Sequence, residues 1–528
     1  MSRRGSFFVG AGILMSRMFG LVRQRVLVHY LGLQTEAADA LAAAFRIPNF
    51  LQNLLGEGAL SASFIPSYCR LLAKGDEREA RRLAGALLAI LVCTVTVIVL
   101  LGELATPWLM DVFISHDWTG SKRALTEQLV RVLFPGAGLL AISAWCLGVL
   151  NSHGRFLLSY ASPVVWNLAI IVASIFIGRH QPPAQFAVTV AWGSVVGSLL
   201  QVVAQWPAVI AVGGAIRPVF WNNVQEIREV ITAFVPNLIS RGANQISAYI
   251  DLLIASAVPI TGAVAAMVNA QVLYTLPVSL FGMAVSAAEL PEMSREHGEP
   301  EAVARALRVR LADATERLAF YIVPSAVGFL ALGGVVAGAI FQGGRFSSND
   351  TSFVWIVLGG SSIGLLASTL GRLYASAFYA LHDTRTPLQC GVVRVGLTAI
   401  LGVTAALILP PALGVAPRWG VAGLTASAGL AGWVEFALLR RGIFRRVGRF
   451  TMPDHHLLKL WAAALVAAAV GTAARLGAAG MGPIPLALVV IPANAATYVA
   501  LAYALRIPEA RSLVAWVRGR SHRSPLAP

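Results

Sequence analysis

Charged residues are scarce in this 528-residue chain: Asp, Glu, Lys and Arg make up 12% of it, whereas 57% is hydrophobic and the mean hydropathy is +0.71. An ordinary soluble domain, with about 25% charged residues, is therefore excluded. A membrane-spanning helix needs about 20 mainly apolar residues. Residues 83–102 (LAGALLAILVCTVTVIVLLG) supply such a run without a single charge. The composition predicts an all-α integral membrane protein.

Cysteine is also scarce, and the usual signatures of catalysis are absent. The four cysteines, Cys69, Cys93, Cys146 and Cys390, show no CxxC or Cys/His spacing, so we interpret them as small buried hydrophobic residues. The sequence has no HExxH zinc motif, no Walker-type phosphate loop, no GxSxG elbow and no paired histidines within a span. We therefore expect a transporter, with no enzymatic activity, cofactor or metal site.

The net charge of +16 does not indicate a nucleic-acid partner, because the basic residues fall in short loops between apolar runs. Those runs predict fourteen helices. Their ranges are 6–32, 37–70, 83–114, 124–150, 157–178, 184–213, 227–258, 262–290, 316–342, 351–381, 387–411, 418–439, 457–477 and 484–505. An even number of spans places both termini on one side of the membrane.

The distribution of Lys and Arg predicts which side that is. If the termini are cytoplasmic, the inner loops and tails hold most of the 41 basic residues, including the run from Arg440 to Arg449. The outer loops then hold only Lys122, Arg123, Arg179, Arg345, Arg418 and Arg475. Short cytoplasmic loops carry such an excess. The predicted location is the cytoplasmic (inner) membrane, with many spans and both termini inside.

An internal repeat predicts two similar lobes. Residues 54–66 (LLGEGALSASFIP), followed by GDEREARR, resemble residues 280–291 (LFGMAVSAAELP), followed by GEPEAVAR, about 225 residues later. Six helices separate the copies, so both have the same orientation, which implies lobes related by an axis along the membrane normal, as in alternating-access transporters. The predicted domains are an N-terminal lobe (1–220), a C-terminal lobe (221–445), a C-terminal helix pair (446–506) and a cytoplasmic tail (507–528), polar enough to be disordered.

Charges inside the predicted helices are the candidate functional residues, since each costs several kcal/mol in hydrocarbon. Arg17 and Arg23 lie in the first helix, about 120° apart around a straight axis. Asp39, Arg46, Asn53 and Glu57 would fall within roughly a 40° sector of an ideal second helix. Later helices add Arg241, Asp251, Arg372 and Glu435.

Two interpretations of these charges stay open. The acids can simply neutralise the arginines and fasten helices together. Alternatively, the excess of cations lines a central cavity for an anionic substrate such as a phosphate or pyrophosphate.

Several segments carry a resemblance to a known family. They are SRMFGLVR at 16–23, ADA at 38–40, FRIPN at 45–49, GEGA at 56–59, FIP at 64–66, FQGGRF at 341–346 and FYALHDTRTP at 378–387. With these, the sequence resembles the MurJ (MviN) family of lipid II flippases, within the multidrug/oligosaccharidyl-lipid/polysaccharide exporter superfamily, over essentially all the predicted helices.

The resemblance implies export of an undecaprenyl-pyrophosphate-linked peptidoglycan precursor, lipid II, from the inner to the outer leaflet, without direct use of ATP. It implies that Arg17, Arg23, Asp39 and Glu57 match positions needed for function. It further implies surrounding membrane lipids, a coupling ion or the membrane potential as energy source, and a monomer. The family often has basic residues where Gln52 and Asn53 stand here. It also has an Asp-Arg-x-x-Glu pattern where Gln271, Val272 and Thr275 stand. The remaining alternatives are an exporter of another polyprenyl-linked glycan or of a cationic drug, and a non-transporting scaffold for envelope assembly.

Overall fold

The structure, a computed structural model, describes residues 3–55, 57–214, 216, 224–283, 285, 293, 300–381, 383–449, 454–517 and 519. Within these ranges, side chains are described except at 3–11, 50–62, 224–226, 233, 235–244, 283, 300, 454, 516 and 517. The described chain is helical, as predicted, and contains no strand. It divides into two compact units, Met1–Ala257 with Gly344–Phe346, and Val258–Gly343 with Ser347–Pro528.

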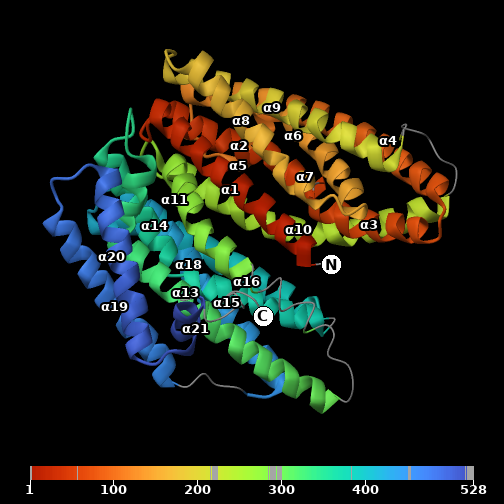
Figure 1. The fold of residues 1–528 in the computed structure, drawn as a ribbon. Coiled ribbons are helices and arrows are strands. Elements are labelled where there is room, and N and C mark those ends of the chain that lie inside the picture. The colour runs from red at the N-terminus through yellow and green to blue at the C-terminus, as the bar shows by residue number, and fades with distance from the viewer. Residues whose placement is uncertain are drawn as a thin grey trace. The chain divides into compact units, whose positions relative to one another are not determined.

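The first unit contains the helices coloured red to yellow-green in Figure 1. They are α1 (Arg3–Leu31), α2 (Glu36–Leu55), α3 (Glu57–Ala73), α4 (Glu77–Leu104), α5 (Thr106–Phe113), α6 (Gly120–Ser152), α7 (Phe156–Ala161), α8 (Pro163–Val172), the π-helix η1 (Ala173–Gly178), α9 (Pro183–Gly213) and α10 (Val224–Ala257). Helix α6 packs against α2, α3, α4 and α9, so it forms the centre of this unit. A core around Phe64, Leu83 and Trp145 fills the space between α3, α4 and α6.

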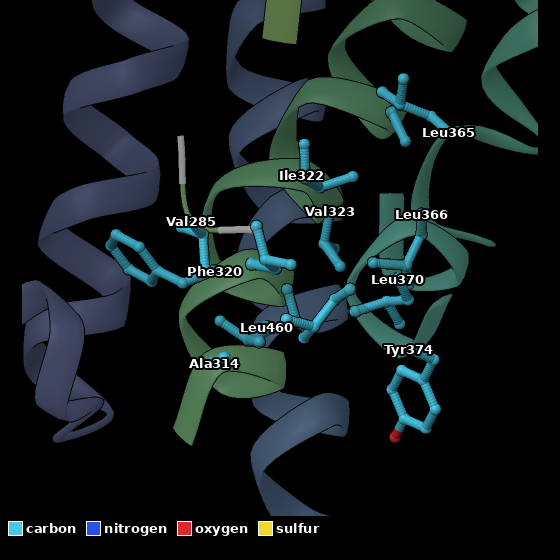
Figure 2. Packing of buried hydrophobic residues seen from close by; sticks show 14 of the residues in the cluster. Val285, Ala314, Phe320, Ile322, Val323, Leu365, Leu366, Leu370, Tyr374 and Leu460 are labelled. Carbon is cyan, nitrogen blue, oxygen red and sulfur yellow. The ribbon is translucent and has the colours of Figure 1, made fainter. Parts of the chain in front are cut away.

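The second unit contains the green to blue helices. They are α11 (Ala263–Pro277), the π-helix η2 (Val278–Met283), α13 (Pro300–Phe341), α14 (Ser348–Ser362), α15 (Leu365–Ala380), α16 (Arg385–Val403), the π-helix η3 (Thr404–Ile408), α17 (Leu409–Leu413), α18 (Arg418–Val447), α19 (Asp454–Gly477), α20 (Pro483–Ala504) and α21 (Pro508–Val517). Helix α13 packs against α14, α15, α19 and α20. Figure 2 shows part of the apolar core at this junction, with Phe320, Val323 and Leu370 among its members.

Among the described residues, ten helices are long and apolar enough to cross a membrane. An eleventh span results if α14 and α15, which are bent by 44°, are counted together. The predicted total of fourteen is consistent with this number but stays a prediction.

The predicted helix 37–70 corresponds to α2 and α3. Residue 56, between them, and the side chains of residues 50–62 lie outside the described residues, so the predicted stripe of Asp39, Arg46, Asn53 and Glu57 stays a prediction. Another predicted span is divided. The predicted helix 83–114 ends at Leu104 and restarts as α5, where a proline near the new N-terminus has no N–H to continue the hydrogen-bond ladder.

The bend between α14 and α15 has a packing cause. A Cβ on Gly364, at the bend, would collide with the Cα of Gly429 on α18. Small residues let membrane helices approach this closely. The backbones of α18 and the bent pair therefore approach most closely where both have glycine.

The tail after Arg506 differs from the prediction of disorder. Residues 508–517 form α21, and Ile507 and Ala510 are buried in the core of the second unit. The overall polarity of this short segment predicted disorder, but its apolar residues lie at helical spacing. Docking of these residues against α13, α19 and α20 therefore stabilises a helix. The predicted lobe boundary at 220/221 stays a prediction. The two compact units are defined by packing, and they place α10, which follows this boundary in the chain, with the first unit.

Candidate functional site

The first-helix arginines lie in different surroundings on α1. Arg17 is exposed, whereas Arg23 is half-buried. The Arg23 guanidinium carbon lies 4.7 Å from the ring centroid of Trp166 on α8, which is a cation–π contact. Its Nε has no hydrogen-bond partner among the described residues. Helix α1 continues through Gly20 without interruption, so the two arginines lie on different faces of one helix.

Trp166 is itself held in place by two neighbouring helices. Its Nε1 donates to the carbonyl and the hydroxyl of Ser194 on α9, each at 3.1 Å. Phe45 on α2 meets the ring edge-on, with the ring centroids 6.4 Å apart. The ring that Arg23 meets is therefore fixed before any substrate arrives. A cation–π contact in such a desolvated position contributes on the order of 2 kcal/mol.

Asp39 forms a buried ion pair with Lys122, at the N-terminus of α6. The distance between Lys122 Nζ and Asp39 Oδ2 is 2.9 Å, and the Asp39 side chain is 0% exposed. The same ammonium lies 3.7 Å from the ring centroid of Trp118. Trp118 donates from Nε1 to the Ser256 carbonyl at 3.0 Å, at the end of α10. The sequence placed Lys122 in an outer loop and gave no signal for this pairing.

Arg46 fastens α2 to α10. Its Nη1 donates to the Ala248 carbonyl at 3.2 Å, and the Tyr249 hydroxyl donates to the Arg46 carbonyl at 2.8 Å. The Asp251 carboxylate also acts electrostatically on the Arg46 guanidinium. Arg46 is thus bound by neighbouring helices, as the helix-fastening interpretation expects. The side chains of Glu57 and Arg241 lie outside the described residues.

In the second unit, two arginines share one carboxylate. Arg394 Nε on α16 lies 3.2 Å from Glu435 Oε2 on α18, an ion pair without hydrogen-bond geometry. Arg372 on α15 is exposed and also acts electrostatically on Glu435. The Tyr274 hydroxyl on α11 lies 2.6 Å from that of Ser368 on α15. The sequence analysis did not select Arg394 as a candidate residue. An arginine within the apolar run 385–403 is the feature that could have identified it.

Within each unit, considered by itself, the arginines can bind an anion. In the first unit, the Arg23 guanidinium lies against the face of an aromatic ring. In the second unit, the two positive charges of Arg372 and Arg394 outnumber the single negative charge of Glu435. Guanidinium groups that keep free N–H donors suit phosphate oxygens. Where the sequence departs from the resembled family, Thr275 donates to the Gln271 carbonyl within α11 at 2.7 Å, so this helix satisfies its own polar groups there.

Long apolar helices that hold cations beside aromatic and carboxylate partners define a multi-pass integral membrane protein. The family model "Lipid II flippase MurJ" matches residues 27–488. The chain belongs to this family, as the resemblance predicted.

Curated relatives agree with the family. The chain is similar to "Probable lipid II flippase MurJ" of Haemophilus influenzae, with 29% identity over 392 residues, 72% of this chain and 76% of that protein. It is also similar to "Lipid II flippase MurJ" of Burkholderia cenocepacia, with 27% identity over 396 residues, 74% of this chain and 75% of that protein.

Solved structures agree with the fold. A lipid II flippase MurJ in an inward closed conformation superposes with a TM-score of 0.78 at 19% identity, over 96% of this chain and 100% of that one. An inward-facing multidrug resistance transporter of the MATE family, in the MOP superfamily, gives a TM-score of 0.64 at 16% identity, over 81% of this chain and 95% of that one. At these identities the likeness concerns the fold alone.

Proposed function

We propose that this chain moves lipid II from the inner to the outer leaflet of the cytoplasmic membrane by alternating access. The observation that carries the proposal is Arg23, a half-buried cation within α1 that is held against Trp166 and whose Nε has no hydrogen-bond partner in the described part of the chain. A charge in this position is costly unless a substrate uses it. The substrate of the family, lipid II, contains a pyrophosphate group. This group is the anion that Arg23 binds in the proposal.

The proposed roles of the other charges follow from their partners. Arg17, exposed on the same helix, binds the pyrophosphate together with Arg23, and Arg372 adds positive potential in the second unit. Asp39 and Arg46 hold α2 in place through α6 and α10, so that α2 keeps its position beside the substrate path. Arg46 also faces the pyrophosphate in this scheme. Glu57 gates access, and Arg241 contributes a further cation.

The proposed topology has both termini in the cytoplasm. The basic segment 440–449 then lies at the inner face, where anionic lipid headgroups attract it. The protein works as a monomer, and an ion gradient or the membrane potential drives the cycle. The lipid tail stays outside the polar cavity, since moving its methylenes out of hydrocarbon would cost about 0.8 kcal/mol each.

A second candidate is export of a different polyprenyl-linked glycan. The neutral residues Gln52, Asn53, Gln271 and Val272, at positions where the family resemblance leads us to expect charges, favour it, because they alter the contacts available to the head group. A non-transporting scaffold is a third reading, and it has no need for Arg23 inside α1.

The experiment is replacement of a host's own flippase. The host's lipid II flippase is depleted, this chain is expressed, and the lipid II that becomes accessible on the outer leaflet is measured. We expect export to be restored, to be lost with Arg23→Ala and to be retained with Arg78→Ala, which removes an exposed arginine of α4.

The outcomes separate the candidates. No export from a well-expressed, membrane-inserted chain would contradict the lipid II proposal and favour the other glycan. Export that persists in Arg23→Ala would contradict the role of Arg23. A chain that supports envelope growth without any lipid export would favour the scaffold.

A further inference from the structure

Three side chains from distant parts of the second unit come together where α21 docks. Glu316 lies on α13, His456 lies in the first turn of α19, and Glu509 lies in the first turn of α21. One donor atom from each lies within 4.8 Å of the other two. None of these residues belongs to the charged groups described above, and Glu509 lies beyond residue 488, where the family match ends.

The histidine and one carboxylate of this cluster lack hydrogen-bond partners. His456 is only 7% exposed, and its Nε2 and the Oε2 of Glu509 are both buried without a hydrogen-bond partner among the residues that the structure describes. These two atoms are 4.0 Å apart, which is too long for a hydrogen bond. Leaving such groups buried and unsatisfied costs about 1–3 kcal/mol each. A ligand between them would remove that cost.

The spacing fits a shared metal ion better than a direct contact. Two ligand atoms, each at 2.0–2.2 Å from one tetrahedral ion, lie roughly 3.4 Å apart. The observed 4.0 Å between His456 Nε2 and Glu509 Oε2 is about 0.6 Å longer than that ligand spacing. A neutral imidazole and two carboxylates also balance the charge of a divalent ion, so the occupied site would be neutral inside the protein.

Rigid packing holds the three ligands in place. Ala314, two residues before Glu316, and Leu460, one turn after His456, belong to the same apolar core and lie close together in Figure 2. Ile507 and Ala510, on either side of Glu509, are buried in that core as well. Ligands on packed helices are pre-organised for one geometry, as metal sites require.

We propose that Glu316, His456 and Glu509 bind a divalent transition-metal ion of the zinc class. One imidazole nitrogen with carboxylate oxygens suits Zn²⁺ or Co²⁺, whereas Mg²⁺ and Ca²⁺ prefer oxygen ligands alone. The ion fastens α21 to α13 and α19, and it therefore ties the C-terminal segment to the second unit. No sequence motif marks this site, because its three ligands are far apart along the chain.

The first experiment is a cobalt titration. The full chain is purified in detergent with an affinity tag that contains no histidine, stripped with a chelator and titrated with Co²⁺. We expect one equivalent to produce the visible absorption bands of tetrahedral Co²⁺, and Zn²⁺ to displace it. His456→Gln and Glu509→Gln should weaken binding by about 100-fold or more. His455→Gln removes the exposed neighbouring histidine and should leave binding unchanged.

A second measurement keeps the proposal testable if a variant fails to fold. X-ray absorption of the zinc-loaded wild-type chain should show one imidazole nitrogen with oxygen donors. Two or more imidazoles, no saturable binding by the wild type, or equal loss in His455→Gln would each overturn the site. Transport is not measured, so the result is independent of the flippase proposal.

Discussion

Lys122 Nζ lies 2.9 Å from Asp39 Oδ2, and the aspartate is completely buried. The pair links the start of α6 to the start of α2, and the ring of Trp118 covers the ammonium. Removing one partner of a buried ion pair leaves an uncompensated charge. The pair therefore makes the packing of α2 depend on one lysine of α6.

The first prediction concerns this pair. Lys122→Met should lower the free energy of unfolding by about 3–5 kcal/mol, because Asp39 would remain buried without its cation. Thermal or denaturant unfolding of the purified protein measures the loss. The matched control is Arg70→Met, which breaks the exposed pair with Glu229, 53% and 44% exposed, and should cost no more than about 1 kcal/mol. Equal effects of the two substitutions would contradict the role assigned to burial.

The second prediction concerns Arg23 and Trp166. Trp166→Leu should weaken lipid II binding by up to roughly 30-fold, since the lost cation–π contact is on the order of 2 kcal/mol. Because Trp166 acts through Arg23, adding this substitution to Arg23→Ala should weaken binding little further. Affinity of the purified protein for lipid II is the measurement. Trp192→Leu, at an exposed position of α9, serves as the control. Fully additive losses would show that the two residues act separately.

The third prediction concerns the crossing of α18 with the bent pair α14–α15. Gly429→Ala should destabilise the protein by about 1–3 kcal/mol, because its new Cβ would lie 2.8 Å from the Gly364 backbone nitrogen, which has no room to move. Gly432→Ala, three residues along the same helix, meets nothing within 4 Å and should be neutral or slightly stabilising. Melting temperatures of the two variants, measured side by side, decide. A stable Gly429→Ala would show that the crossing tolerates a wider separation.

The fourth prediction concerns pH and Asp383, in the loop between α15 and α16. Its carboxylate accepts the Thr386 hydroxyl at 2.6 Å and the Thr386 and Arg385 amides at 3.0 and 2.9 Å, and it pairs with Arg446. These bonds, with those from Thr386 the largest, lower its pKa below the usual 3.8. A lowered carboxyl pKa stabilises the fold above the unfolded pKa, and this stabilisation is lost as the pH falls through the folded value.

The matching variant is Asp383→Asn. At neutral pH it should be less stable than the wild type, and the difference should shrink as the pH falls below about 4, where the wild-type carboxyl takes up its proton. Unfolding measured across pH for both proteins provides the comparison. A difference that stays constant down to acid pH would show that the charge of Asp383 does not contribute.

The sequence alone determined the class of this protein. Long apolar runs require a bilayer, and the energetic cost of each charge within them is a local property, so the helices and the unusual positions of Arg17, Arg23 and Asp39 could be recognised without coordinates. The family motifs are local as well, and they predicted the membership that the comparisons confirmed.

Only the tertiary structure decided which partner each charge meets. Lys122 is 83 residues from Asp39, and no periodicity relates the two. Trp166 beside Arg23, Arg394 beside Glu435 and Glu509 beside His456 likewise come from different helices. The bend at Gly364 and the docking of α21 also depend on neighbouring helices. Composition and spacing describe one segment at a time, whereas these contacts arise from the packing of segments that are distant in the chain.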